Sequence, residues 1–200
     1  MSHLKKFRAA LAERGADAAI IGSKLNQKYL SDFDFDDGFV LVTKGQSYLI
    51  TDFRYVEAAT EQRNPELEVL MPNIGMLTCM EELLRENGCR KVMIEEETLS
   101  FADYGKYSEK LTGMELCSGA SALLEELRLY KDEKELETMA RAQAVTDAAF
   151  AHILNFIKPE MTEIEVALEL EFFMRRNGAD GLAFDTIAIS GTTIVRVMSE

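Results

Sequence analysis

Tryptophan is absent from this chain of 200 residues, and aromatic residues make up only 8% of it. The core must therefore be built mainly from Leu, Ile, Val, Met and Phe, which the 47% hydrophobic content supplies. That content excludes an intrinsically disordered chain. The length suffices for one large domain, or for one compact domain and part of another.

Basic residues are also scarce, because 22 Lys and Arg face 35 Asp and Glu, for a net charge of −13. Such a surface repels phosphate and anionic lipid, which excludes nucleic acid and membrane as partners. No stretch approaches the ~20 apolar residues of a membrane span. The charged residues 1–15 lack the apolar core of a secretory signal. We therefore expect a soluble, cytoplasmic protein.

Cysteine and histidine are too few to form the common metal-binding and redox sites. Cys79, Cys89 and Cys117 have no C-x-x-C spacing and are typical of reduced, buried thiols. His3 is close to the N-terminus, and His152 stands alone inside a predicted helix. Packing or surface exposure is the favoured interpretation of His152, and metal binding or acid–base work the lesser alternative.

Other familiar motifs are missing as well. None of the twelve glycines has the G-x-G spacing of phosphate loops, and no G-x-S-x-G nucleophile elbow occurs. The acidic stretch 32–38 fails as an EF-hand, because loop positions six and twelve are Asp37 and Thr43. We expect a solvated acidic loop there, with weak cation binding as the alternative. The run Glu95–Glu97 is predicted to be a charged strand end.

Hydrophobic patterning predicts an α/β domain over residues 1–125, because short apolar runs alternate with helical patterns. From Ser121 onward two long helices and one strand are predicted. The first helix starts at the cap Asp132 and runs to about Ile157, and the second starts at the capping box of Thr162 with Glu165 and runs to Asn177. Phe184–Ile189 is the predicted strand.

Several stretches in one order resemble the Xaa-Pro peptidase family of aminopeptidase P, prolidase and creatinase. They are Tyr29-Leu30-Ser31, Thr51-Asp52-Phe53-Arg54-Tyr55, 126–136, 156–167 and 184–191. The resemblance implies a creatinase/prolidase-type N-terminal α/β domain (mixed sheet with flanking helices) at 1–125. It also implies an incomplete start of a pita-bread α+β catalytic domain at 126–200.

The resemblance implies metal-dependent hydrolysis of the Xaa-Pro peptide bond, with proline-containing peptides as substrates. In the intact family two divalent metals such as manganese are held by two Asp, one His and two Glu, and they activate a bridging hydroxide. The family pattern continues from Ser190-Gly191 to a Pro-His pair and these ligands, whereas this chain reads Thr192–Glu200 and stops. No catalytic, metal or cofactor-binding residue is therefore assigned, and no cofactor is expected in this chain.

Two hypotheses on function follow. The first is a truncated Xaa-Pro aminopeptidase or dipeptidase that is inactive alone, and the second is a non-catalytic dimerisation or interaction module. The expected partner is a second copy or a full-length relative. Arg54 and Tyr55 are candidates for an interface or a substrate mouth, although an ion pair of Arg54 with Asp52 or a nearby acid is the favoured interpretation. The apolar stripes of the second long helix need cover from a partner or from the first domain, or else the segment is poorly ordered.

Overall fold

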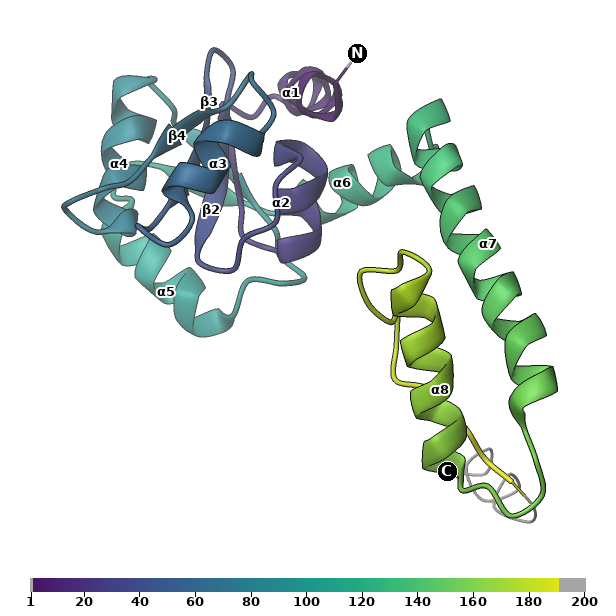
Figure 1. Cartoon of the computed structure of the whole chain (residues 1–200). Helices are drawn as coiled ribbons and strands as arrows, with labels where there is room; N and C mark the ends of the chain where they lie inside the picture. The colour runs from purple at the N-terminus through teal and green to yellow at the C-terminus, as the bar shows by residue number, and fades with distance from the viewer. Residues whose placement is uncertain (1, 191–200) are drawn as a thin grey trace. The chain divides into compact units, whose positions relative to one another are not determined.

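The computed structural model describes residues 2–190 and divides the chain into two compact units, Met1–Tyr130 and Lys131–Glu200 (Figure 1). Among the described residues, no helix has both the length and the apolar character that crossing a bilayer requires. The first unit is built around a sheet, and the second around two helices.

A six-stranded mixed sheet forms the centre of the first unit, in the order β4-β3-β2-β1-β5-β6. The strands are β1 (Ala18–Ile21), β2 (Gly38–Thr43), β3 (Ser47–Thr51), β4 (Glu68–Leu70), β5 (Lys91–Ile94) and β6 (Glu115–Cys117). β2 pairs antiparallel with β1 and β3, and the other neighbouring strands are parallel. The predicted mixed sheet is confirmed, and β2 and β3 form a hairpin within it.

Both faces of this sheet are covered by helices, because successive strand residues point to opposite sides and are apolar on both. Ala19 and Ile21 of β1 belong to one core, and Ala18 and Ile20 to the other. The first core is closed by α1 (His3–Glu13), α2 (Lys24–Ser31), α3 (Val56–Gln62) and α6 (Ala120–Leu129). The second core is closed by α4 (Met76–Glu86) and α5 (Phe101–Lys110).

The structure contains a helix, α6, that the sequence analysis did not predict after Ser121. Its Leu123 and Leu124 are buried in the first core, and the Tyr29 hydroxyl donates to the Leu127 carbonyl at 3.3 Å. These contacts attach α6 to the first unit, which extends to Tyr130.

The second unit consists of α7 (Glu133–Phe156), α8 (Glu163–Arg176) and the segment that follows. The predicted cap Asp132 and the predicted capping box of Thr162 with Glu165 are both present, and Asp132 also forms a capping box with Glu135. Asp132 accepts from the Glu135 backbone N–H at 2.9 Å, and Thr162 accepts from that of Glu165 at 3.3 Å. Because each box satisfies N–H groups that a helix leaves unpaired, the sequence marks these two helix starts closely.

The strand predicted at Phe184–Ile189 is absent, since residues 184–190 form neither a helix nor a strand. No other strand lies among the described residues of the second unit. An isolated extended segment has no neighbour with which to form ladder hydrogen bonds. The apolar pattern alone therefore gave the wrong element.

Two predictions of burial are corrected by the structure. Of the three free thiols only Cys89 is buried, and Cys79 and Cys117 are half-buried. Burial raises the pKa of the Cys89 thiol to about 11, which makes it unreactive. Of the acidic run after β5, Glu96 and Glu97 are exposed as predicted, but Glu95 is buried.

Candidate functional site

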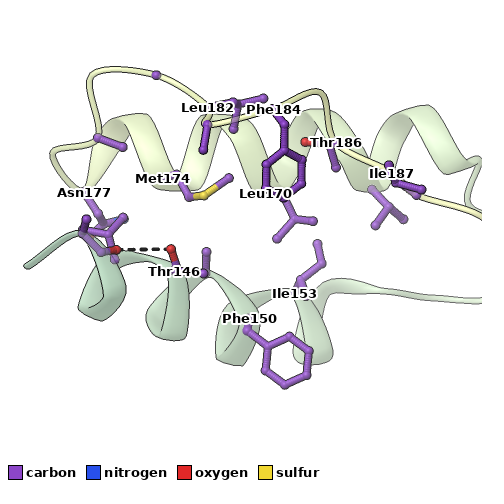
Figure 2. A pocket seen from close by; sticks show the side chains of 18 of the residues that line it. Thr146, Phe150, Ile153, Leu170, Met174, Asn177, Leu182, Phe184, Thr186 and Ile187 are labelled. Atoms are coloured by element: carbon purple, nitrogen blue, oxygen red, sulfur yellow. Dashed lines mark hydrogen bonds between the residues drawn. The ribbon is translucent and has the colours of Figure 1, made fainter. Parts of the chain in front are cut away.

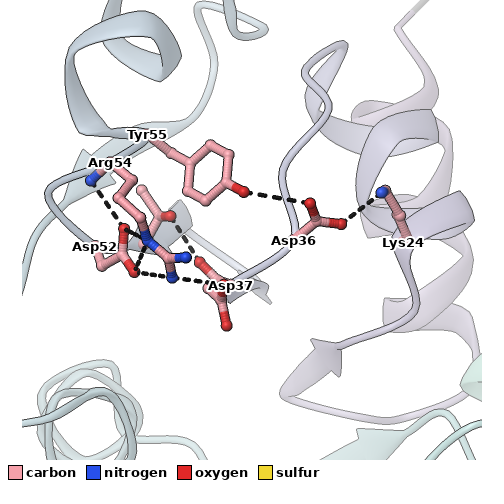
Figure 3. A network of polar contacts seen from close by, with 7 residues as sticks. Lys24, Asp36, Asp37, Asp52, Arg54 and Tyr55 are labelled. Carbon is pink, nitrogen blue, oxygen red and sulfur yellow. Dashed lines mark hydrogen bonds and ion pairs between the residues drawn. The ribbon is translucent and has the colours of Figure 1, made fainter.

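Arg54 lies in the turn between β3 and α3, where it contacts two carboxylates (Figure 3). Its guanidinium donates to both Asp52 oxygens, with Nε 3.0 Å from Oδ2, and its Nη2 lies 2.5 Å from Oδ2 of Asp37. The backbone N–H of Arg54 also donates to Asp52 Oδ1 at 2.9 Å. Asp52 therefore fixes the turn through both the main chain and the side chain of Arg54.

These contacts shift the titration of the groups that make them. Hydrogen bonds from Arg54 lower the pKa of Asp52, and the two carboxylates raise the pKa of Arg54. Because half of the Arg54 side chain is exposed, solvent and salt screen the pairs. The favoured interpretation of Arg54 as a local ion pair is confirmed, and its role at an interface or a substrate mouth stays a prediction.

Tyr55 joins the acidic loop 32–38 to the same turn. Its hydroxyl donates to Asp36 Oδ2 at 3.3 Å, and Lys24 Nζ lies 2.5 Å from Asp36 Oδ1. Asp34 pairs with Lys28 at 3.0 Å. The loop carboxylates thus bind separate basic side chains and do not converge on one point, which supports the solvated acidic loop over the cation site.

Gly38 positions this loop against β3. Its φ is +143°, and a Cβ atom there would lie 2.1 Å from the Ile50 carbonyl oxygen, so only glycine fits. The Thr51 hydroxyl donates to the Asp37 carbonyl at 2.7 Å, and Gln27 Nε2 donates to the Gly38 carbonyl at 2.9 Å. This close approach places Asp37 beside Arg54.

The second unit holds a groove of about 1530 Å³ between α7, α8 and the segment after α8 (Figure 2). Its lining is mainly apolar. Ile153 comes from α7, Leu170 and Met174 come from α8, and Leu182 and Phe184 from the following segment. Such a surface fits an apolar occupant and offers few polar groups for chemistry.

No histidine or cysteine occurs among the described residues that line this groove. Its carboxylates include Glu163, whose Oε1 accepts from the Ser190 N–H at 2.6 Å and from the Ser190 hydroxyl at 3.0 Å. His152 pairs instead with Glu169 at 2.7 Å, and its ring stacks on Phe173 at 4.3 Å. The predicted packing role of His152 is therefore confirmed.

Comparison with known proteins identifies the class to which both units belong. Residues 3–130 match the Creatinase/Prolidase N-terminal domain, and residues 137–194 match metallopeptidase family M24. The chain therefore belongs to the family defined by the Creatinase/Prolidase N-terminal domain, and the M24 match extends the likeness into the second unit.

Individual relatives agree with this assignment. An uncharacterized peptidase of Bacillus subtilis is 34% identical over 94% of this chain and 53% of its own length. The Xaa-Pro dipeptidase of Pyrococcus horikoshii is 27% identical over 94% of this chain and 52% of its own length. The structure of the Xaa-Pro dipeptidase from Bacillus anthracis has a TM-score of 0.85 at 36% identity and covers 91% of this chain and 50% of that one. The chain thus spans about half the length of the relatives it matches.

Intact members of the M24 family use divalent metals, and the residues of the groove do not fit that requirement. The described lining brings no imidazole together with its carboxylates, and Glu163 is occupied by Ser190. These residues lack the mixed His and carboxylate set of a dinuclear site. No catalytic step through a metal is therefore assigned to residues 2–190.

Proposed function

We propose that this chain is the N-terminal part of an Xaa-Pro aminopeptidase or dipeptidase and that these 200 residues are inactive alone. The observation that carries the proposal is the coverage of its relatives, since the match takes in 94% of this chain but 53% of the Bacillus subtilis peptidase. In the intact protein, two divalent metals such as manganese would hydrolyse the bond before proline in peptide substrates. The three free thiols favour the cytoplasm as its location.

The exposed faces of the second unit support the proposal that this chain is part of a larger protein. Large apolar side chains of α7 and α8 are open to solvent: Leu136, Met139, Phe150, Leu154, Ile164, Leu168 and Phe172. Monomeric proteins rarely leave apolar patches beyond a few hundred Å² uncovered. We expect the remainder of a catalytic domain to cover these faces.

The direct test is hydrolysis of Ala-Pro and Ala-Pro-Ala by the purified 200-residue chain with excess Mn²⁺. We expect no release of alanine above the enzyme-free blank, because the described lining of the groove holds no histidine beside its carboxylates to bind the metals that activate water. The Xaa-Pro dipeptidase of Pyrococcus horikoshii is the positive control. Metal-dependent turnover by the 200-residue chain would overturn the proposal.

A second proposed function is that of a dimerisation or interaction module, which the same exposed faces favour. Light scattering after size-exclusion chromatography would measure the mass over a wide concentration range. If α8 forms the contact, Phe172→Glu converts a dimer into a monomer, whereas Arg176→Ala, also on α8, leaves it intact. Arg54→Ala tests the first unit in the same way. A strict monomer at every concentration, without binding to a full-length relative, contradicts this function.

A further inference from the structure

A small cavity of about 230 Å³ lies in the first unit, at the end of the sheet where β1 and β5 finish. Gly22 and Ser23 follow β1, Glu95 follows β5, and Tyr107 belongs to α5. The cavity shares no lining residue with the groove of the second unit. It therefore requires an explanation of its own.

The topology of the sheet makes this position special. β1 and β5 are adjacent and parallel, so their carboxyl ends meet at the same edge. From β1 the chain enters α2 on the face of the first core and returns as β2, whereas from β5 it enters α5 on the opposite face and returns as β6. The two connections diverge, and open α/β sheets bind ligands at such switch points.

The buried carboxylate of Glu95 decides which ligand charge this cavity accepts. It accepts hydrogen bonds from the backbone N–H groups of Gly22 and Ser23 at 2.6 and 2.8 Å, from the Ser23 hydroxyl at 2.6 Å, and from Asn26 Nδ2 at 2.7 Å. Backbone N–H groups at a helix start are the donors that bind phosphate in nucleotide folds. Glu95 occupies them here, which excludes an anionic ligand.

The charge of Glu95 has no direct counter-ion, since no described basic side chain forms an ion pair with it. The Arg128 guanidinium reaches it only through Asn26, at 3.3 Å from Oδ1. A negative field therefore persists in the cavity, and it favours a cation.

Two hydroxyl groups are available to hold such a cation. Thr98 and Tyr107 line the cavity, and within the part of the chain that the structure describes neither hydroxyl has a hydrogen-bond partner. Burial and the charges of Asp103 and Glu95 raise the pKa of Tyr107, so its hydroxyl stays protonated. Phe39 and Ile94 supply apolar walls beside these groups.

We propose that this cavity binds a primary ammonium ion on a short aliphatic chain, with the ammonium donating to the hydroxyls of Thr98 and Tyr107 in the field of Glu95. The aliphatic chain lies against Phe39 and Ile94. The volume is below the roughly 300–1,000 Å³ of pockets for drug-sized ligands, so the ligand has few non-hydrogen atoms. This site lies in the first unit and does not depend on the proposed peptidase function.

The test is a ¹H–¹⁵N correlation spectrum of the whole labelled chain, titrated at constant ionic strength with n-propylammonium, 1-propanol or propionate. We expect saturable shifts of the Gly22, Ser23 and Thr98 amides with n-propylammonium, and no saturation with propanol or propionate. Tyr107→Phe should weaken binding at least fivefold. Tyr104→Phe on the same helix, outside the cavity lining, should leave it unchanged. The spectrum itself reports whether each variant is folded.

Ala-Ala-Ala amide with a free or an acetylated amino terminus distinguishes two sources of the ammonium group. Binding of the free peptide alone indicates a peptide terminus, and binding of n-propylammonium without the peptide indicates a free amine. The proposal is overturned if none of these cations saturates the shifts, if propionate binds equally well, or if Tyr107→Phe binds as tightly as Tyr104→Phe.

Discussion

Glu95→Gln is expected to destabilise the first unit by about 2–3 kcal/mol. The Gln amide oxygen can still accept from the Gly22 and Ser23 N–H groups, but its NH₂ group then faces the NH₂ group of Asn26. Asn26 cannot reverse its amide without losing the bond that Arg128 donates to its Oδ1. One orphaned buried donor costs about 1–3 kcal/mol, and the remaining bonds lose their charge assistance.

The assay can be confined to the first unit because of where the tyrosines lie. The chain has no Trp, and all six Tyr residues fall within residues 29–130. Near-ultraviolet circular dichroism of tyrosine therefore reports the unfolding of this unit alone. At about 3–4 °C per kcal/mol for a unit of this size, the melting temperature should fall by roughly 6–12 °C.

Glu97→Gln is the matched control, since Glu97 is exposed two residues away. It should change the free energy of unfolding by less than about 0.5 kcal/mol. If the free energy of unfolding of Glu95→Gln lies within about 0.5 kcal/mol of the wild-type value, the hydrogen bonds of Glu95 do not stabilise the fold.

Three further predictions concern other contacts. Hydrogen bonds from Lys44 and two backbone N–H groups lower the pKa of Asp17 to about 2. Asp17→Asn should therefore lower the free energy of unfolding, measured with urea above pH 4, by about 1 kcal/mol. That difference from wild type should vanish as the pH falls towards 2. A difference that stays constant with pH would refute the stabilising role of the ionised Asp17 carboxylate. Gly38→Ala should cost more than about 3 kcal/mol because its Cβ meets the Ile50 carbonyl, whereas Gly45→Ala should be nearly neutral. His152→Ala should increase amide exchange across α8, and unchanged exchange would contradict its packing role.

Most elements could be predicted because their signals are local. The helix starts at Asp132 and Thr162 follow from capping boxes within four residues of sequence, and the buried strands follow from short apolar runs. Helix α6 escaped prediction because its pattern adjoins that of the next long helix. Phe184–Ile189 has a strand pattern but lacks the neighbour that a strand requires.

The polar clusters could be predicted only where both partners are close in sequence. The pair of Arg54 with Asp52 was foreseen, but its second partner Asp37 is brought there by the register of β2 against β3. Glu95 reads as part of an exposed acidic run. Its donors at Gly22 to Asn26 lie about 70 residues away in sequence, and the parallel pairing of β1 with β5 brings them together.

The central proposal is that this chain is part of an Xaa-Pro peptidase and that residues 2–190 do not hold the metal pair that the intact family uses. Electron paramagnetic resonance of Mn²⁺ tests it most directly, because protein-bound manganese loses the sharp six-line signal of the free ion. We predict that the purified chain leaves the signal of equimolar Mn²⁺ essentially unchanged at micromolar concentrations. Stoichiometric loss of the signal, approaching two ions per chain, would contradict the account.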